Sequence, residues 1–370
     1  MSSSSKVGID RRSFILATGA GALAAASGSA ATVAPPKEGG ALKKLGPMLA
    51  NAEIRTCERM KGRKCCSSFI DDTIWVIRDL ARQKPKSLFD NPFLKAQKRA
   101  HDLYGLKVQL NLFYRTDFFY GTDEFTLAEM PDTYKAEWQA NKDWLRLSFH
   151  SLQEYPDYPF VNATYKDAKH VLDRTKGEVL RFAGEGVFSP IAVPHWAPIS
   201  KEAVLALRDG GMKVIYSTHG PRFEYAGDRD ALPYGHAFRL EQGRKPETAL
   251  YSRGGRNKAI DSSVCAYNHL TDEQGKATLA TYAVVYDRET KMNFKRFSIG
   301  PCLNLTPLDE IEKDFARALG REYIIYFNHE QYFYKDFFWY QPDYADKVLA
   351  AAKWLHGHGY EYIFMDEMLD

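Results

Sequence analysis

A histidine and a carboxylate follow one strand-like stretch at short spacing. Leu145, Leu147 and Phe149 alternate with period two, which places them on one face of a predicted strand. His150 comes next and Glu154 four residues later, a spacing that one helical turn brings to the same side. An imidazole and a carboxylate held together are part of a divalent-metal site. A surface histidine followed by a loop glutamate is the alternative explanation.

Most of the other predicted strands end in the same kinds of residue. In parallel α/β folds, ligands bind at the rim where the carboxyl ends of the strands meet. The residues that follow the predicted strands are Asp71 and Asp72, Tyr114 and Arg115, His150 and Glu154, His195 and Trp196, Thr218 and His219, His329 and Glu330, and Asp366 and Glu367. This convergence favours a metal or acid–base site over a solvated surface. Helix capping by Asp71 and Asp72, and a turn at His219, are the competing explanations for single members.

Strand and helix patterns alternate along most of the chain and would position these residues. The periodicity predicts strands at 67–70, 106–113, 145–149, 188–193, 213–217, 322–327 and 360–365, and helices at 74–82, 132–141, 165–180, 201–208, 307–319 and 342–355. This order predicts a parallel sheet, open or closed into a barrel, within a single domain over 51–370. Residues 222–303 break the rhythm and are predicted to be an insertion on one face, with a hairpin around 287–290.

The composition predicts a globular protein with one large core, or at most two domains. Its charge balance gives no sign of a strongly charged partner. The chain has 370 residues, of which 45% are hydrophobic and 14% aromatic, enough for a sizeable core. The 50 basic and 47 acidic residues nearly cancel. The balance therefore argues against binding to nucleic acid or to an anionic membrane surface.

The first 31 residues are predicted to be a targeting segment. Arg11 and Arg12 precede an Ala- and Gly-rich apolar run that ends in small residues suited to cleavage, which resembles a twin-arginine signal of bacteria. The run is too short and too rich in Ala and Gly for a transmembrane span. The mature protein is therefore expected in the periplasm or outside the cell, without an integral membrane segment. Residues 32–50 are predicted to be a linker.

Five cysteines, an odd number, match no zinc-ribbon or redox motif. In an oxidising compartment, Cys57 can pair with Cys65 or Cys66, and Cys265 with Cys302. Buried free thiols are the alternative, and the sequence does not decide between the two.

Three short motifs together resemble a known family. Asp71 and Asp72 follow the first predicted strand, a His-Ser-x-x-ligand motif begins at His150, and His329 follows a late strand. Over roughly residues 67–368 these motifs resemble the NodB-like polysaccharide deacetylases, a superfamily of carbohydrate esterases. The resemblance implies a deformed (β/α) barrel, in which residues 222–303 would be the irregular, β-containing insertion, and removal of N- or O-acetyl groups from a polysaccharide.

The resemblance also implies roles for individual residues. Asp71 corresponds to the family's general base and His329 to its general acid. Asp72 and His150 correspond to metal ligands, and the implied cofactor is a divalent metal such as zinc.

Two departures from the family pattern leave the remaining metal ligand open. The second metal-binding histidine of the family is replaced here by Glu154, and the family's Arg-x-Pro-aromatic motif is represented only by the stretch 194–196. Three alternatives follow: Glu154 completes the site, His195 completes it, or the site holds no metal.

Further rim residues are candidates for substrate binding. The planar guanidinium of Arg115 suits a carboxylate or sulfate group. Trp196 and the aromatic run 331–340 offer flat faces for sugar rings, although an aromatic core beneath the last helix explains the run equally well. His219 and Glu330 complete this set.

Three classes of function follow. The first is a metal-dependent deacetylase. The second is a metal-independent glycoside hydrolase or lyase that uses carboxylates for acid–base chemistry. The third is a carbohydrate-binding protein without activity. The carboxylates available to the second class are Asp71, Asp72, Glu154, Glu330 and Glu367.

Overall fold

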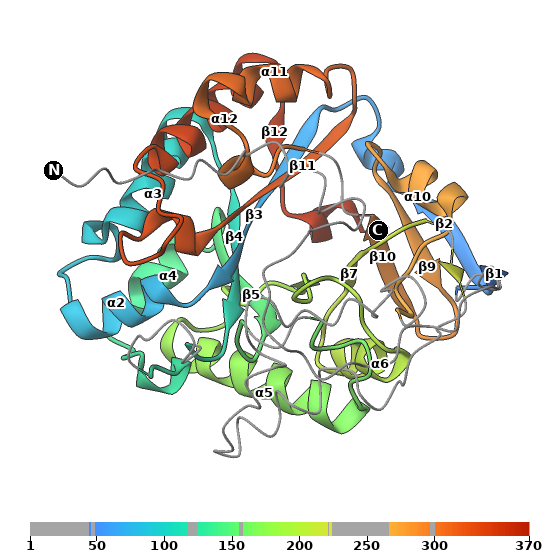
Figure 1. The fold of residues 1–370 in the computed structure, drawn as a ribbon, viewed down its shortest axis with the longest axis horizontal. Coiled ribbons are helices and arrows are strands. Elements are labelled where there is room, and N and C mark those ends of the chain that lie inside the picture. Colours follow the sequence, from blue (N-terminus) through green and yellow to red (C-terminus); the bar gives the residue numbers. More distant parts are fainter. Residues whose placement is uncertain are drawn as a thin grey trace, which may run out of the picture.

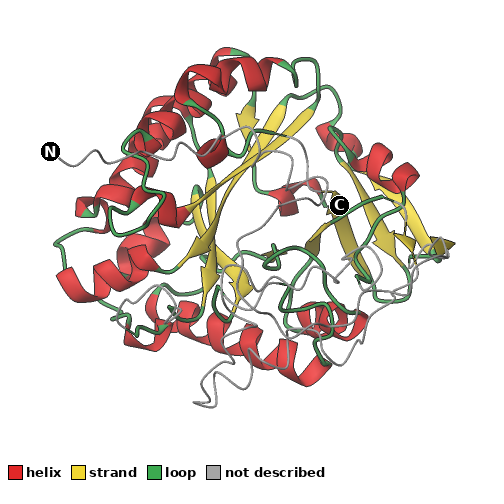
Figure 2. Ribbon diagram, viewed as in Figure 1, coloured by secondary structure: helices red, strands yellow, loops and turns green. Residues whose placement is uncertain are grey.

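The computed structural model describes residues 44–45, 49–116, 124–154, 158–220, 222–223, 266–296 and 300–369. The predicted targeting segment, most of the predicted linker and Cys265 lie outside these ranges. The described chain is a mixed α/β fold in which helices lie outside the strands (Figures 1 and 2). The predicted alternation of strands and helices is confirmed.

The sheet that carries most of the candidate residues is parallel throughout. Its order is β11-β3-β4-β5, and β12 also pairs with β3. The bounds are β3 Cys65–Thr73, β4 Val108–Phe113, β5 Leu145–Ser151, β11 Tyr323–His329 and β12 Glu361–Tyr362. Every residue of β3 and β4 is buried, as expected for parallel strands covered on both faces.

A second sheet has the order β2-β9-β10-β7-β6. Its strands are β2 Ala52–Thr56, β6 Ile191–Ala192, β7 Val214–Ser217, β9 Ala283–Asp287 and β10 Met292–Arg296. Strands β6, β7 and β10 are parallel, whereas β9 runs antiparallel to β10 and β2. The hairpin predicted around 287–290 is confirmed, but its strands belong to the sheet and not to an insertion lying on its face. Residues 224–265 lie outside the described part.

Contacts between β5 and the segment of β6 join the two sheets. Leu147 pairs with Phe188, and the hydroxyl of Ser148 donates to the carbonyl oxygen of Ile191 at 2.6 Å. Two short strands, β1 Lys44–Leu45 and β8 Arg222–Phe223, form a separate antiparallel pair. The contacts of Leu147 and Ser148 with the β6 segment place the carboxyl ends of β5 and β6 next to each other.

Helices pack around the sheets and form the large apolar core with them (Figure 2). Their bounds are α2 Trp75–Gln83, α3 Pro92–Tyr104, α4 Lys135–Asn141, α5 Tyr165–Phe182, α6 Lys201–Asp209, α10 Asp272–Thr278, α11 Ile311–Ala316 and α12 Tyr344–Gly357. Helix α3 was not predicted, although its signals are present. The Asn91 side chain accepts from two backbone N–H groups, Pro92 begins the helix, and Gly105 ends it at φ 72°.

The strands of the parallel sheet extend further toward the candidate residues than predicted. Asp71 and Asp72 lie within β3, His150 lies within β5, and His329 is the last residue of β11. No helical turn joins His150 to Glu154, because His150 continues the strand and the chain then bends. The predicted turn is therefore wrong.

None of the described cysteines forms a disulfide bond. Cys57, Cys65 and Cys66 are buried, and Cys302 is partly buried. A pairing of Cys57 with Cys65 or Cys66 is thus not formed, and the alternative of buried thiols holds for these three. Burial raises the pKa of the Cys66 thiol well above its usual value, which keeps it protonated and inert.

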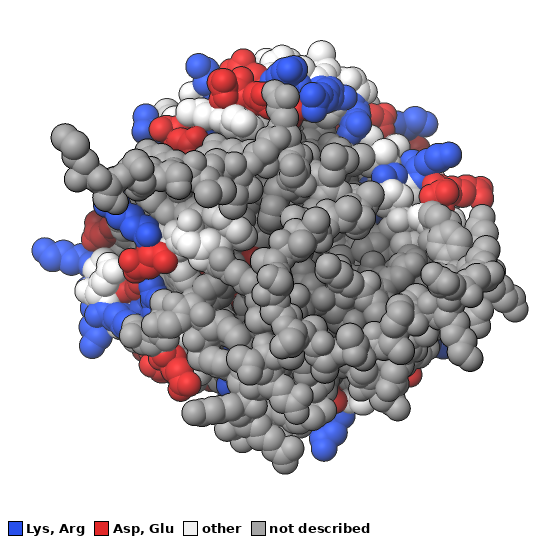
Figure 3. Space-filling view, in the orientation of Figure 1, with Lys and Arg blue, Asp and Glu red and all other residues white. Residues whose placement is uncertain are grey.

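Charge is mixed over the described surface. In Figure 3, Lys and Arg side chains alternate with Asp and Glu around the margin of the face shown, in agreement with the near-neutral composition. Among the residues that the structure describes, no helix is both long enough and apolar enough to cross a membrane.

Candidate metal centre

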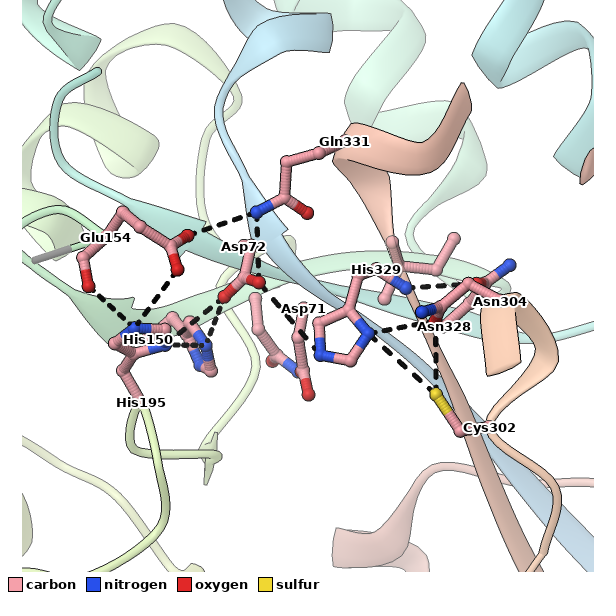
Figure 4. Close-up of polar contacts among 12 residues, drawn as sticks. Asp71, Asp72, His150, Glu154, His195, Cys302, Asn304, Asn328, His329 and Gln331 are labelled. Atoms are coloured by element: carbon pink, nitrogen blue, oxygen red, sulfur yellow. Dashed lines mark hydrogen bonds and ion pairs between the residues drawn. The ribbon is translucent and has the colours of Figure 1, made fainter. Parts of the chain in front are cut away.

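A break in the register of β3 places Asp72 at the rim. The pairing of β3 with β4 shifts between Ile70 and Thr73, and Asp72 has φ 58°, in the left-handed region. Regular strand geometry would turn adjacent side chains to opposite faces. With the irregularity, both Asp71 and Asp72 are directed into the site (Figure 4). Such a conformation costs of the order of 1–3 kcal/mol, so the surrounding structure must hold it in place.

Asp72, His150 and His195 bring three potential ligand atoms together. Oδ1 of Asp72 lies 3.1 Å from Nε2 of His150 and 3.2 Å from Nδ1 of His195. The two ring nitrogens are 3.0 Å apart. All three residues are buried (Figure 4). Around a tetrahedral zinc ion with bonds of ~2.0–2.1 Å, ligand atoms are about 3.3 Å apart, so the cluster has close to the spacing of such a site.

Backbone carbonyls set the tautomers of the two imidazoles. Nδ1 of His150 bonds to the carbonyl oxygen of Val193, and Nε2 of His195 bonds to that of Glu154 at 2.8 Å. A carbonyl oxygen can only accept, so these nitrogens carry the protons. The opposite nitrogens then turn lone pairs toward each other and toward the Asp72 carboxylate. Three electron-rich atoms at this spacing need a shared cation or proton, and a carbonyl partner on the far nitrogen is typical of metal-binding histidines.

Burial and hydrogen bonding act in opposite directions on the charges of this cluster. Burial opposes ionisation of Asp72, but its contacts with the rings of His150 and His195, which become hydrogen bonds when an imidazole takes a second proton, hold the pKa of this carboxyl well below its usual range. Burial also opposes protonation of His150, yet the hydrogen bond to Asp72 and the charge of Asp71 raise the pKa of the imidazole. The site is thus a buried anion that favours a positive neighbour.

Neighbouring side chains hold the histidines in position. Phe113, at the end of β4, packs against both rings, with centroid distances of 5.3 Å to His150 and 5.0 Å to His195. The backbone N–H of His195 donates to the carbonyl oxygen of His150 at 3.1 Å. Trp196 and Ala197, which follow, both have positive φ values, 63° and 68°. This strained turn directs the His195 ring back toward β5.

Glu154 lies beside the cluster but supplies none of its three ligand atoms. Its Oε1 is 4.0 Å from Nε2 of His195, the protonated nitrogen. Its Oε2 accepts from Nε2 of Gln331 at 3.1 Å, and the same amide nitrogen donates to Oδ2 of Asp72 at 3.0 Å. Of the two residues proposed to complete the site, the geometry therefore favours His195. The sequence did not predict a role for Gln331. A glutamine amide is neither a typical metal ligand nor an acid or base, so nothing in the sequence marks it as a site residue.

A chain of buried amides supports Asp71. Asn111 Nδ2 donates to Oδ1 of Asp71 at 2.6 Å, and Gln109 Nε2 donates to Oδ1 of Asn111 at 2.7 Å. Gln109 and Asn111 stand two apart on β4 and are fully buried. They therefore share one face of the strand and fix one oxygen of Asp71.

His329 faces the cluster from the other side, next to Asp71 across the β3–β11 pairing. Its Nδ1 lies 2.9 Å from Oδ1 of Asn304, which accepts, so Nδ1 carries a proton. Its Nε2 lies 4.0 Å from Oδ2 of Asp72, and about a quarter of the side chain is exposed. The Sγ atom of Cys302 is 3.9 Å from Nδ1. The exposed nitrogen of His329 can therefore exchange a proton with a bound molecule.

Glu330 was predicted to contact substrate at the rim, but it lies in the interior of the protein. It is fully buried, and its carboxylate accepts from the backbone N–H groups of Ile74, Trp75 and Val76 at 2.7, 2.8 and 2.6 Å. It thus binds the amino end of α2, where the helix dipole favours negative charge. Burial raises the pKa of Glu330 to about 7, against the effect of these hydrogen bonds. This position corrects its assignment as a residue that contacts substrate.

Asp366 and Glu367 also do not reach the predicted rim. Asp366 pairs with Arg146 at 3.2 Å, and Glu367 pairs with Lys107 at 3.0 Å. Arg146 lies near the amino end of β5 and Lys107 precedes β4. The two carboxylates therefore lie at the opposite end of the sheet from His150. This excludes Glu367 as a partner of the cluster.

The remaining predicted substrate residues lie at separate places along the rim. The Arg115 Nε donates to Oε1 of Gln153 at 2.6 Å. Trp196 contacts the His195 ring at a centroid distance of 5.8 Å and Tyr158 at 5.3 Å. His219 lies just beyond β7 on the surface, where partial loss of solvent around its ring, together with the charge of Arg296, lowers the pKa of its imidazole. Of the three, Trp196 is the one in contact with a residue of the cluster.

Comparisons with known proteins find similarity in structure alone. No family model and no curated protein sequence matches this chain. Similar solved structures include a family 4 carbohydrate esterase from Streptomyces lividans in complex with acetate, at 11% identity and TM-score 0.37, over 82% of this chain and 93% of that chain. A family 4 acetyl xylan esterase from Clostridium thermocellum with a cobalt ion has 11% identity and TM-score 0.39, over 82% and 90%.

A third similar structure, a 4-alpha-glucanotransferase from Thermococcus litoralis, has 10% identity and TM-score 0.44, over 83% of this chain and 40% of that chain. At these scores the likeness carries no argument about function, which has to come from the site itself. The first two structures are both family 4 carbohydrate or acetyl xylan esterases.

Proposed function

We propose that this protein is a metal-dependent hydrolase that removes acetyl groups from a polysaccharide. The supporting observation is the cluster of Asp72, His150 and His195, whose ligand atoms lie 3.0–3.2 Å apart with both histidine tautomers set by backbone carbonyls. Asp72, His150 and His195 would hold the metal, and Glu154 would not. We further propose that the two sheets form a deformed (β/α) barrel of the NodB type.

When bound, a divalent cation such as zinc supplies Lewis-acid chemistry, because it polarises a carbonyl oxygen and lowers the pKa of water from ~15.7 to about 7. The residues around the cluster divide the proton transfers. Asp71, with one oxygen fixed by Asn111, accepts a proton from the attacking water molecule. His329, whose Nε2 lies 4.0 Å from Oδ2 of Asp72, donates a proton from Nε2 to the leaving nitrogen or oxygen.

The carboxylate mechanism of a glycoside hydrolase or lyase has less support. Two of its five candidate carboxylates are removed, since Glu330 binds a helix end and Glu367 lies at the opposite end of the sheet. Of the remaining three, Asp72 is bound to two histidines and Glu154 to Gln331. A metal-dependent mechanism accounts for the contacts of Asp72 with the two histidines, because all three would be metal ligands.

Export through the twin-arginine pathway, with action in the periplasm or outside the cell, remains a proposal from the sequence. Residues 1–31 lie outside the described part of the chain. A protein that folds before export by that pathway would carry its metal across the membrane, which suits a ligand set assembled from three distant parts of the chain.

The test is elemental analysis of protein purified without chelators, followed by an assay of acetate release from acetylated oligosaccharides. We expect about one equivalent of metal in the wild type and in Glu154→Gln, and none in Asp72→Ala/His150→Ala. Acetate release should depend on that metal. A wild type without metal, or full activity in the double variant, would contradict the proposal. Metal without acetate release would identify a binding protein.

A further inference from the structure

Two adjacent aromatic side chains are exposed close to His329. Phe338 and Trp339 are each 46% exposed, in the segment between the short helix Glu330–Phe333 and α12. The other large exposed apolar residues of the described chain stand singly in the sequence: Ile54, Leu103, Tyr165, Leu308 and Leu319. Single exposed apolar residues are ordinary, whereas a local apolar patch beside a site indicates binding.

A series of ring contacts connects this pair to the candidate general acid. The ring of His329 contacts Tyr332 at a centroid distance of 6.2 Å, and Tyr332 lies 6.4 Å from Trp339 with an angle of 14° between their planes. Phe338 lies 4.2 Å from Trp339. Trp339 is therefore two ring contacts from His329, and its face is nearly parallel to that of Tyr332.

The segment that carries these rings is held at several points. Backbone N–H groups of Tyr334, Phe337 and Tyr340 each donate within the segment, at 2.9–3.0 Å. Gln341 closes it, because its backbone N–H donates to the carbonyl oxygen of Tyr332 at 2.8 Å and its side chain donates to that of Asn304 at 2.7 Å. Phe337 is buried against Trp75. The exposed rings are thus fixed before anything binds, which lowers the entropic cost of binding.

We propose that Tyr332, Phe338 and Trp339 form an aromatic platform that binds a pyranose ring of the substrate polymer, next to the sugar that reacts. The identity of the polymer rests on the proposed function. A flat aromatic face matches the C–H face of a sugar ring, while the sugar hydroxyls at its margin stay in water. The platform selects a polysaccharide over a free acetylated monosaccharide, which would reach His329 without covering Trp339.

The test compares the full-length wild type with Trp339→Ala, Trp339→Phe and the control Leu103→Ala, which removes an exposed apolar side chain from α3. Probes are N-acetylated β-1,4-glucosamine hexamers, O-acetylated xylan hexamers and the matching acetylated monosaccharides. Calorimetry measures binding, and acetate release gives kcat and KM. We expect Trp339→Ala to bind a hexamer about tenfold more weakly, and the hexamer-to-monomer ratio of kcat/KM to fall by a similar factor. Trp339→Phe should retain most of the affinity, and Leu103→Ala all of it.

The outcomes separate this inference from the proposed function. Weaker hexamer binding in Trp339→Ala, in a wild type without turnover, supports the platform and contradicts the deacetylase. Turnover with the same hexamer KM in Trp339→Ala as in the wild type overturns the platform and keeps the deacetylase. A change of oligomeric state in Trp339→Ala with unchanged hexamer binding identifies a contact between copies of the chain and also overturns the platform. The absence of hexamer binding in the wild type overturns it as well.

Discussion

The side-chain nitrogen of Gln331 lies 3.0 Å from Oδ2 of Asp72, the carboxylate oxygen that faces away from the two histidines. The other oxygen, Oδ1, lies between His150 and His195. The amide therefore occupies one oxygen of Asp72 and leaves the other for a metal. The same nitrogen also contacts Glu154, so the glutamate that stands in place of the family's second metal-binding histidine anchors Gln331.

Replacement of Gln331 tests this arrangement. In Gln331→Leu, both carboxylates lose a donor, and we expect metal affinity to fall by about 10–100-fold, the usual effect of removing a partner of a metal ligand. Metal titration with a competing chelator measures the change. Glu154→Gln is the matched control, because an amide oxygen can still accept from Gln331, and its metal affinity should stay close to that of the wild type. Equal affinity in Gln331→Leu and wild type would remove Gln331 from the site.

Asn304 is expected to orient the general acid. Its Oδ1 accepts from Nδ1 of His329, so Asn304→Leu should lower kcat by about 10²-fold, within the range for a general acid that is wrongly placed. Asn304→Asp keeps an oxygen acceptor at the same position, so kcat should fall much less in this variant than in Asn304→Leu. Cys302→Ser is the control, because a hydroxyl keeps the donor that the Sγ atom of Cys302 presents to Oδ1 of Asn304 at 3.1 Å, and kcat should stay close to that of the wild type. Equal kcat in Asn304→Leu and the wild type would argue against this role.

Metal binding should stabilise the fold, because its ligands come from three distant parts of the chain. A ligand at 100 times its dissociation constant adds about 2.7 kcal/mol to the free energy of unfolding. We expect the midpoint of thermal unfolding to fall when a chelator is added to the wild type and to return with excess zinc. The double variant Asp72→Ala/His150→Ala should show neither change. A chelator effect of equal size in the double variant would place the metal elsewhere.

Glu330 should make stability depend on pH. Its pKa is about 7 in the folded protein, above the ordinary value of 4.5. Between these values the folded state keeps a proton that the unfolded state has lost. The contribution to stability is therefore complete below about pH 4.5 and is lost as pH rises through about 7, with an upper bound of about 3 kcal/mol. The free energy of unfolding in urea should decrease from pH 5 to pH 8 in the wild type, and less so in Glu330→Gln. The same decrease in both proteins would contradict the assignment.

The sequence alone determined the order of the elements and the kinds of residue at the site. Period-two alternation at 145–149 and 106–113 predicts β5 and β4, and Ser200 and Thr164 mark the starts of α6 and α5 correctly. These signals are local, because periodicity and capping depend on residues a few positions apart. Asp72, His150 and His195 were all among the predicted metal ligands for the same reason, since each closes or follows a strand.

Only the tertiary structure decided which of these residues meet. The choice of His195 over Glu154 depends on a strained turn at Trp196 and on two carbonyl partners far apart in the chain. Asp366 was predicted at the same rim as His150, yet it lies at the opposite end of the sheet, because β12 pairs only with the first two residues of β3. Gln331, Asn304 and Asn111 gain their roles purely from contacts across strands. Hydrogen bonds between residues distant in sequence depend on register and irregularities of pairing, which no local pattern encodes.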